Sequence, residues 1–251
     1  MTARHVTFVI PAYNEAKAIT PVIEGALAAA DEVVVVDDGS ADETATVARA
    51  AGATVARHGK NLGQGAAIET GIELACRAGA THVVTFDADG QHSPGDAARM
   101  VERLDREGLD AILGTRGGKR HGMPLERFLV LKAALLFTRL TTGLKVTDTH
   151  NGLRAFTARA AVLLDLRQNR MAHASEILGR IAKLRLAYAE EQVTVRYTDY
   201  SRAKGQSSLG AIRILLDLAR ARVSPPGDLA ETRRVREQAI EEALAGRKSA
   251  G

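Results

Sequence analysis

The first 115 residues of the chain alternate short apolar runs with longer stretches of helical periodicity. Short apolar runs that end at a polar or turn-forming residue predict buried strands. Such runs lie at 6–10, 33–36, 53–57, 82–86 and 110–114. The Ala-rich stretches between them predict helices at about 16–30, 42–51, 64–78 and 94–107. Apolar strands separated by helices are typical of a parallel sheet covered on both faces, so we expect an α/β fold.

The pattern changes after residue 116, where a glycine-rich basic loop begins. The chain then predicts a long amphipathic helix, a loop with a short strand, a helix, a strand, a basic loop and a last helix. Their ranges are 124–143, 146–157, 173–186, 191–197, 198–208 and 209–222. Two adjacent prolines at 225–226 cannot continue a helix, so we expect the folded part to end there. The charged, Ala-rich tail from residue 229 predicts a solvated helix with a frayed end.

Polar clusters follow four of the five predicted strands in the first part of the chain. They are "PAYNE" (11–15), "DDGS" (37–40), "DADGQ" (87–91) and "GTR" (114–116). Ligands of open parallel sheets bind beyond the carboxyl ends of the strands. The four clusters therefore predict one ligand site along a single edge of the sheet.

The "DADGQ" cluster places two carboxylates, Asp87 and Asp89, one residue apart at the end of a strand, with Gln91 two residues further on. Strand side chains alternate, so the two carboxylates would share a face if the strand continued. Like charges held so close repel one another unless a cation lies between them, and hard oxygen ligands suit Mg²⁺ or Mn²⁺. A strand-end turn with a helix-capping aspartate would explain the same residues.

Two loops offer backbone amides to a ligand. The segment 37–44 opens a helix that Ser40 or Asp42 could cap, and Gly63 and Gly65 precede the next helix. Amides at such helix starts could approach a phosphate or a base, although tight turns alone would also explain the glycines. Neither loop has the Gly-Lys-Ser/Thr ending of a Walker loop. The first strand ends in "PAYNE" and not in Gly-x-Gly-x-x-Gly, which disfavours a nicotinamide or flavin enzyme.

Composition adds limits to this picture. The net charge of +4 makes anionic partners plausible but is too small to indicate nucleic acid. The single cysteine, Cys76, permits no disulfide within the chain and is expected to be a small core residue. The longest apolar stretch, 128–137, is broken by Lys132 and falls short of the ~18 residues of a membrane span. We therefore expect a cytoplasmic protein.

Seven segments of the chain carry a resemblance to a known family. They are VIPAYNEAKAI, VVVVDDGSADET, NLGQGAAIETGI, FDADGQH, GTR, DTHNGLRAF and YSRAKGQSS. Together they resemble the family 2 glycosyltransferases of the GT-A fold, and most closely the dolichyl- and polyprenyl-phosphate sugar synthases. The resemblance implies a Rossmann-like, mostly parallel sheet. It also implies inverting transfer of sugar from a nucleotide diphosphate sugar, with Mg²⁺ or Mn²⁺ as cofactor.

The resemblance also implies roles for individual residues. Those expected to contact the nucleotide are Pro11, Tyr13, Glu15, Asp38, Gly65, Asp87 and Ala88. Those expected to hold the metal are Asp87, Asp89 and Gln91. Those expected near the phosphates or the acceptor are Arg116, Arg127, Arg202 and Lys204. Arg202 and Lys204 would lie on a mobile loop that closes over the phosphates, where Arg202 would stabilise the charge of the leaving diphosphate.

Asp148 is the candidate for a general base. A hydroxyl acceptor must lose a proton to a base, whereas a lipid phosphate is already anionic. A sugar-orienting role, or pairing with Arg154, would explain Asp148 as well. Leu131 stands where the polyprenyl branch usually has a serine, which leaves the acceptor open. His150 and His173 are further candidates, although a lone histidine is more often structural.

We expect a glycosyltransferase that moves a sugar to a polyprenyl phosphate, with the amphipathic helix docking on the inner face of the cell membrane as a peripheral contact. Transfer to a saccharide hydroxyl in cell-surface polysaccharide or glycolipid assembly is an alternative. A non-catalytic nucleotide-sugar-binding module is disfavoured by the intact "DADGQ" segment. A nucleotidyltransferase is disfavoured because the loop after the first strand is not glycine-rich. We expect a nucleotide-binding half at 1–116, an acceptor-binding half at 117–222 and a charged tail at 223–251.

Overall fold

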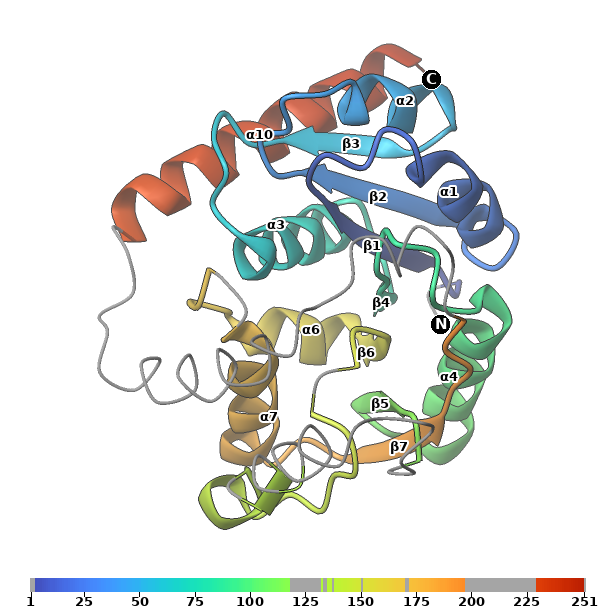
Figure 1. Cartoon of the computed structure of the whole chain (residues 1–251), viewed down its shortest axis with the longest axis vertical. Coiled ribbons are helices and arrows are strands. Elements are labelled where there is room, and N and C mark those ends of the chain that lie inside the picture. The colour runs from blue at the N-terminus through green and yellow to red at the C-terminus, as the bar shows by residue number, and fades with distance from the viewer. Residues whose placement is uncertain are drawn as a thin grey trace.

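The computed structural model describes residues 3–117, 132, 135–136, 138–149, 151–169, 172–196 and 229–250, and the structural statements below concern these residues. A seven-stranded sheet has the strand order β3-β2-β1-β4-β6-β5-β7 (Figure 1). Its strands are β1 (Val6–Ala12), β2 (Glu32–Asp37), β3 (Thr54–Arg57), β4 (His82–Thr85), β5 (Ala111–Thr115), β6 (Arg154–Thr157) and β7 (Tyr188–Gln192). Neighbouring strands are parallel, except that β6 runs antiparallel to β4 and β5. The expected mostly parallel α/β sheet is confirmed.

Helices cover both faces of the sheet, as strands that are apolar throughout require. One face packs against α3 (Gln64–Arg77), α6 (Ala158–Leu164), α7 (His173–Leu184) and α10 (Leu229–Ala250). The other face packs against α1 (Ile19–Leu27), α2 (Thr44–Ala50) and α4 (Pro94–Glu107). In β2, Val34 and Val36 join the first core while Val33 and Val35 join the second. Cys76 packs against the first core, as predicted.

Some predicted elements have different ends. The helices predicted at 16–30, 42–51, 64–78, 94–107 and 173–186 are confirmed, with ends shortened by up to three residues, as in α1, whereas the helix predicted at 124–143 lies largely outside the described residues. The run 82–86 is a strand only to Thr85. The strand predicted at 191–197 lies earlier in the chain, at β7, because pairing with β5 along the edge of the sheet fixes its position. β7 contains Glu190, Glu191 and Gln192 and has no fully buried residue, so apolar content alone did not reveal it. The helix predicted at 209–222 lies outside the described residues.

The expectation that the tail helix is simply solvated is wrong. α10 lies along α3 and the edge strand β3 (Figure 1), and Ala239, Ile240 and Ala243 are buried there. The Arg77 side chain of α3 donates two hydrogen bonds to Glu237 of α10, at 2.8 and 2.9 Å. The three buried residues form a narrow apolar stripe that the average charge of the tail conceals.

The antiparallel direction of β6 brings its first residue to the edge where the ligand site is predicted. Arg154 pairs with Thr85 at the end of β4 and with Leu113 near the end of β5. Its backbone therefore lies beside the loops that follow those strands. A parallel strand at this position would have directed the start of β6 to the opposite edge.

Candidate active site

Asp87 and Asp89 follow β4 on a turn, so strand alternation does not fix their orientation. Side-chain contacts hold Asp87 instead. His92 Nε2 lies 2.9 Å from Asp87 Oδ2, and Gln64 Nε2 donates to Oδ1 at 3.4 Å. Burial raises the pKa of Asp87, but the hydrogen bond and charge of His92, followed by the charge of Arg154, hold it below its usual value. The carboxylate is thus kept ionised inside the site.

Asp89 carries the second carboxylate of the pair. Its Oδ1 accepts a hydrogen bond from the backbone amide of Gln91 at 3.0 Å. Burial raises the pKa of Asp89, and the negative charges of Asp87 and Glu15 add to this against the hydrogen bond from Gln91. Such crowding of hard, anionic oxygen donors fits a divalent cation of the Mg²⁺ or Mn²⁺ type.

Further oxygen donors would have to complete such a site. In the described ranges no group of three or more His, Cys, Asp and Glu side chains converges on one point. Two carboxylates together with oxygens of a bound diphosphate would suit Mg²⁺, which is commonly bound by one or two carboxylates and substrate phosphates. Gln91 lies on the same turn, and its carbonyl accepts the Arg196 amide at 2.9 Å. A role for the Gln91 side chain as a metal ligand stays a prediction.

Gly152 packs directly against Asp87. A Cβ atom built on Gly152 would lie 2.1 Å from Asp87 Oδ2 and 2.6 Å from Oδ1, far inside any normal contact. The Thr85 hydroxyl donates to the Gly152 carbonyl at 2.7 Å, which ties this turn to the end of β4. Only a residue without a side chain allows this turn and this carboxylate to lie so close.

A second group of charges surrounds Arg154. The Arg116 guanidinium donates to both oxygens of Asp148, from Nε at 2.6 Å and from Nη2 at 2.9 Å. Arg154 itself is only 3% exposed. Burial lowers the pKa of Arg154 to about 10, against the opposing charges of Asp87 and Asp148. Arg154 therefore interacts electrostatically with both carboxylates, while the hydrogen bonds on both oxygens of Asp148 come from Arg116.

Asp38 holds the second glycine-rich loop in place. Its Oδ1 accepts the Leu62 amide at 2.9 Å and contacts His58 Nδ1 at 2.7 Å, and its Oδ2 accepts the Gly63 amide at 2.7 Å. Both carboxylate oxygens thus have partners within the protein. Contact between Asp38 and a base or ribose stays a prediction.

The amides at the start of α3 have a hydrogen-bond partner within the protein, so their approach to a phosphate or a base stays a prediction. The amides of Gly65 and Ala66 both lie close to the Asn169 carbonyl, at 2.8 and 3.3 Å. A Cβ atom on Gly65 would lie 2.0 Å from the Gln168 carbonyl oxygen. The glycine therefore permits a close approach of the 168–169 segment, and its predicted place beside the nucleotide is untested.

The segments 11–15 and 37–44 are joined to each other. The Asn14 amide donates to Ser40 Oγ at 2.9 Å, and the Glu15 amide donates to Thr44 Oγ1 at 2.9 Å. Ser40 therefore does not cap the following helix, whereas Asp42 accepts the Thr44 amide at 3.1 Å. The residues that are predicted to contact the nucleotide differ in solvent exposure. Tyr13 is exposed, Pro11 is half-buried, and Glu15 and Ala88 are buried.

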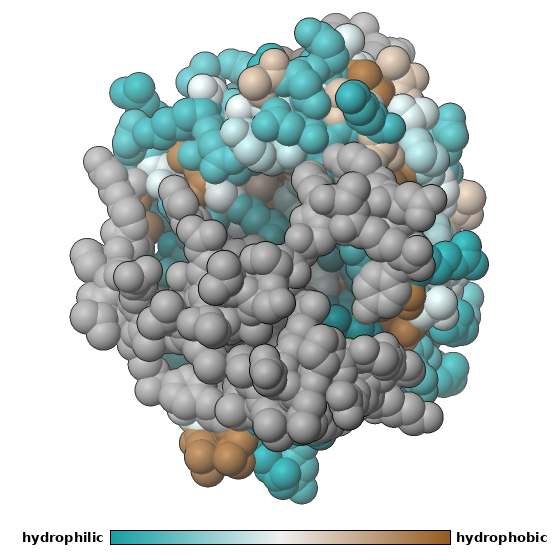
Figure 2. Space-filling model, viewed as in Figure 1, coloured by the Kyte–Doolittle hydropathy of each residue, from teal (hydrophilic) through white to brown (hydrophobic). Residues whose placement is uncertain are grey.

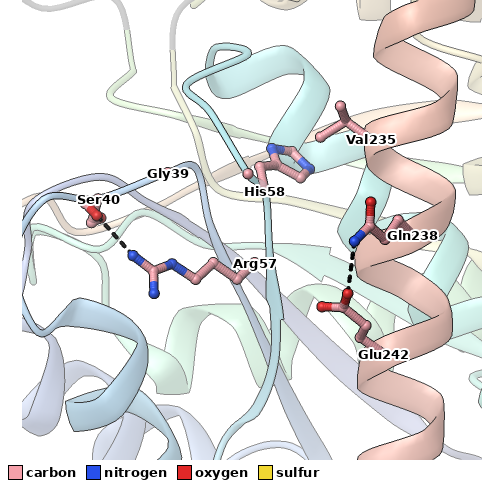
Figure 3. A pocket seen from close by; sticks show the side chains of 8 residues that line it. Gly39, Ser40, Arg57, His58, Val235, Gln238 and Glu242 are labelled. Atoms are coloured by element: carbon pink, nitrogen blue, oxygen red, sulfur yellow. Dashed lines mark hydrogen bonds between the residues drawn. The ribbon is translucent and has the colours of Figure 1, made fainter.

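A pocket of about 380 Å³ adjoins these loops (Figure 3). It is lined by Gly39, Ser40, Arg57, His58, Gly59, Val235, Gln238 and Glu242. Arg57 Nη2 donates to the Ser40 carbonyl at 3.0 Å on one wall, and Gln238 donates to Glu242 at 2.9 Å along α10 on the other. The lining includes neither carboxylate of the "DADGQ" turn, so this pocket is separate from the candidate metal site.

Several predicted residues cannot be placed in this geometry. Arg127, Arg202, Lys204 and His150 lie outside the described residues, so their roles stay predictions. His173, by contrast, is buried at the start of α7, and its charge contributes to the low pKa of Asp87. It therefore lies near the site.

A family model, described as glycosyl transferase family 2, matches residues 7–161, which include both carboxylates and the whole of β6. The chain belongs to glycosyl transferase family 2. It is therefore a glycosyltransferase, and the predicted family is confirmed. The match covers the expected nucleotide-binding half from residue 7 onward and the first part of the expected acceptor-binding half, up to residue 161.

Relatives of this family 2 member include proteins named for lipid phosphate acceptors. It is 31% identical over 241 residues to the UDP-N-acetylglucosamine–dolichyl-phosphate N-acetylglucosaminyltransferase of Methanococcus voltae, covering 87% of this chain and 96% of the relative. It is also 31% identical over 170 residues to the polyprenol monophosphomannose synthase of Mycolicibacterium smegmatis, covering 63% of each.

Among solved structures, glucosyl-3-phosphoglycerate synthase of Mycobacterium tuberculosis with Mg²⁺ and UDP has 25% identity and a TM-score of 0.59. That match covers 86% of this chain and 79% of the other. The fold of this chain is the GT-A fold, as expected.

Four residues that contact or influence Asp87 had no assigned role in the sequence. They are Gln64, His92, Gly152 and Arg154. All four stand within the quoted segments NLGQGAAIETGI, FDADGQH and DTHNGLRAF. The signal that could have found them was their presence in three of the segments that carry the resemblance to the family.

Proposed function

We propose that this family 2 glycosyltransferase moves a sugar, with inversion, from a nucleotide diphosphate sugar to a polyprenyl phosphate, with Mg²⁺ or Mn²⁺ as cofactor. The observation that carries the proposal is the pair of carboxylates at the end of β4, with Asp87 held by His92 and Gln64. The names of the relatives from M. voltae and M. smegmatis support the lipid phosphate acceptor. The Mg²⁺ and UDP bound by the M. tuberculosis structure support the cofactor and donor class.

The residues of the site fit the demands of this reaction. A divalent cation at Asp87 and Asp89 would supply Lewis-acid stabilisation of the leaving nucleoside diphosphate. Asp38 fixes the 62–63 loop on the side of the site where the nucleotide is expected. Tyr13, exposed at 46%, offers an aromatic face at the same edge of the sheet.

The state of Asp148 bears on the acceptor. Its two oxygens already accept hydrogen bonds from Arg116 in a bidentate pair. A carboxylate held in this way is better placed to orient the guanidinium than to take a proton from a hydroxyl. We infer that Asp148 positions Arg116 for an anionic group. A lipid phosphate acceptor needs little help from a base, which agrees with this arrangement.

A surface feature is consistent with an acceptor that resides in a membrane. Leu136 and Leu140 are 58% and 76% exposed and stand four residues apart, in the described helical residues 135–136 and 138–142. Figure 2 shows a hydrophobic patch at the lower end of the molecule, where that segment lies in Figure 1. Exposed leucines with Arg139 between them suit peripheral contact with an anionic lipid surface. None of the described helices combines the length and apolar character needed to cross a membrane.

The proposal is tested by a transfer assay with purified protein. UDP- and GDP-linked sugars would be offered with Mn²⁺ or Mg²⁺, together with either a polyprenyl phosphate in detergent or soluble saccharides. We expect a glycosylated lipid phosphate whose anomeric configuration is inverted, and no product from the Asp89→Asn variant. Transfer to saccharide hydroxyls alone would contradict the acceptor and favour polysaccharide or glycolipid assembly. Full transfer in excess chelator would contradict the metal dependence.

A further inference from the structure

His92 is a buried histidine whose described polar contact is with Asp87. Its side chain is 5% exposed, and its Nε2 lies 2.9 Å from Asp87 Oδ2. The ring packs edge-on against Phe86, with a centroid separation of 5.7 Å. Its other nitrogen, Nδ1, is buried without a hydrogen-bond partner among the described residues. Burying a polar ring with one unsatisfied nitrogen lowers the free energy of unfolding. A histidine at such a position is better explained by its contact with Asp87 than by a contribution to stability.

The backbone around His92 pairs with the segment 194–196. His92 forms an antiparallel bridge with Val195, and the Arg196 amide donates to the Gln91 carbonyl at 2.9 Å. The Thr194 amide donates to Asp96 Oδ2 at 2.6 Å, just inside α4. These contacts fix the direction from which the imidazole reaches the carboxylate.

Asp87 is held from three directions. His92 contacts Oδ2, Gln64 donates to Oδ1 through a long bond of 3.4 Å, and Gly152 closes against the carboxylate so tightly that no Cβ atom would fit. The short bond on Oδ2 fixes the rotation of the carboxylate, and the long bond leaves Oδ1 the more weakly engaged oxygen. An oxygen presented in this way suits a cation that demands near-ideal geometry.

We propose that His92 is a positioning residue for the metal-binding carboxylate. It donates Nε2–H to Asp87 Oδ2 and thereby orients Asp87 toward the cation and the diphosphate. Groups that orient metal ligands in this way typically change metal affinity by about 10–100-fold when they are removed. The inference rests on the proposed metal-dependent function, which it refines by assigning a role to a further side chain.

The strand that precedes the DADGQ turn supplies a matched control. His82, the first residue of β4, is also buried, with 9% side-chain exposure, and its Nε2 lies 2.9 Å from Asp105 Oδ1. Asp105 lies in α4, near its carboxyl-terminal end, and belongs to none of the site loops. The two histidines therefore make matching contacts between Nε2 and a carboxylate, although His82 Nδ1 also lies 3.0 Å from Thr81 Oγ1. Only His92 contacts a candidate metal ligand.

The experiment measures Mn²⁺ binding to the purified full chain in the presence of UDP, by electron paramagnetic resonance of free Mn²⁺. His92→Leu should weaken Mn²⁺ binding about 10–100-fold, whereas His82→Leu should leave it within about threefold of the wild type. His92→Gln, whose amide nitrogen can occupy the place of Nε2, should restore most of the affinity. Circular dichroism would establish that each variant is folded.

The outcomes separate the two claims. A folded His92→Leu variant that binds Mn²⁺ as the wild type does would overturn the role of His92 and leave the proposed function intact. Equal weakening by His82→Leu would also overturn it, because the effect would then be general. If His92→Leu does not fold, His92→Asn replaces it, because asparagine is too short to reach the position of Nε2. A wild type that binds no Mn²⁺ with UDP, and none when GDP replaces UDP, would refute the metal-dependent function and this inference with it.

Discussion

Gly152→Ala should disable the site without changing any charged or polar side chain. Gly152 does not have a positive φ, so the backbone accepts alanine, and the added methyl group is the whole perturbation. That methyl carbon would lie 2.1 Å from Asp87 Oδ2. Because carbon–oxygen contacts lie at about 3.3 Å, the carboxylate or the turn must move by about 1.2 Å.

The size of the effect follows from this displacement. A misplacement of about 1 Å in a catalytic group costs roughly 10²-fold in rate. We therefore expect kcat/KM for sugar transfer to fall about 10²-fold, which corresponds to about 2.7 kcal/mol of transition-state stabilisation. Overpacking should also lower the free energy of unfolding by about 1–3 kcal/mol. Mn²⁺ binding should weaken together with the loss of rate, because the displaced Asp87 is a candidate metal ligand.

The assay compares kcat/KM of Gly152→Ala and Gly179→Ala from initial rates at varied donor concentration and fixed acceptor, with unfolding followed by urea titration. Gly179 lies in α7, and a Cβ atom there meets nothing within 4 Å. Alanine at 179 should stabilise the helix by about 0.5–1 kcal/mol and leave the rate unchanged. A folded Gly152→Ala enzyme with kcat/KM within threefold of the wild type would refute the packing argument.

Three further predictions address the metal, the membrane and pH. Asp89→Ala should lower transfer by about 10³-fold, and chelation should reproduce this loss reversibly, as measured with radiolabelled donor; activity that survives chelation would contradict the metal role. The wild type should sediment with anionic vesicles, less so at high salt, and the Leu136→Ser/Leu140→Ser double variant should remain in the supernatant. Val162→Ser, on the exposed side of α6, should not change sedimentation, because it removes an exposed apolar residue elsewhere. Burial raises the pKa of Glu69 to about 7, so the stability it contributes is complete below pH 4.5 and is lost as pH rises through 7. Glu69→Gln should remove that dependence in melting temperatures between pH 4.5 and 8, and an unchanged profile would show that another group is responsible.

The sequence by itself determined the strands and helices of the first 115 residues and the edge of the sheet where the site is predicted. Apolar runs such as 33–36 report burial on both faces of a strand, a property that the run itself encodes. The polar clusters that follow those runs had to meet, because carboxyl ends of parallel strands lie at one edge. Asp87 and Asp89 could therefore be nominated before any contact was known.

Only the tertiary structure decided which side chains hold those residues and in what state. Three contacts depend on how separate segments pack. They are the pairing of Asp148 with Arg116, the contact of His92 with Asp87 and the hydrogen bond from the Gly65 amide to the Asn169 carbonyl. The insertion of β6 between β4 and β5 in the antiparallel sense brings Arg154 to the site. Local periodicity shows which side of each segment faces the core, but it does not show which other segments pack beside that segment. The partners of Asp87, and the docking of α10 on α3, were therefore settled by the fold.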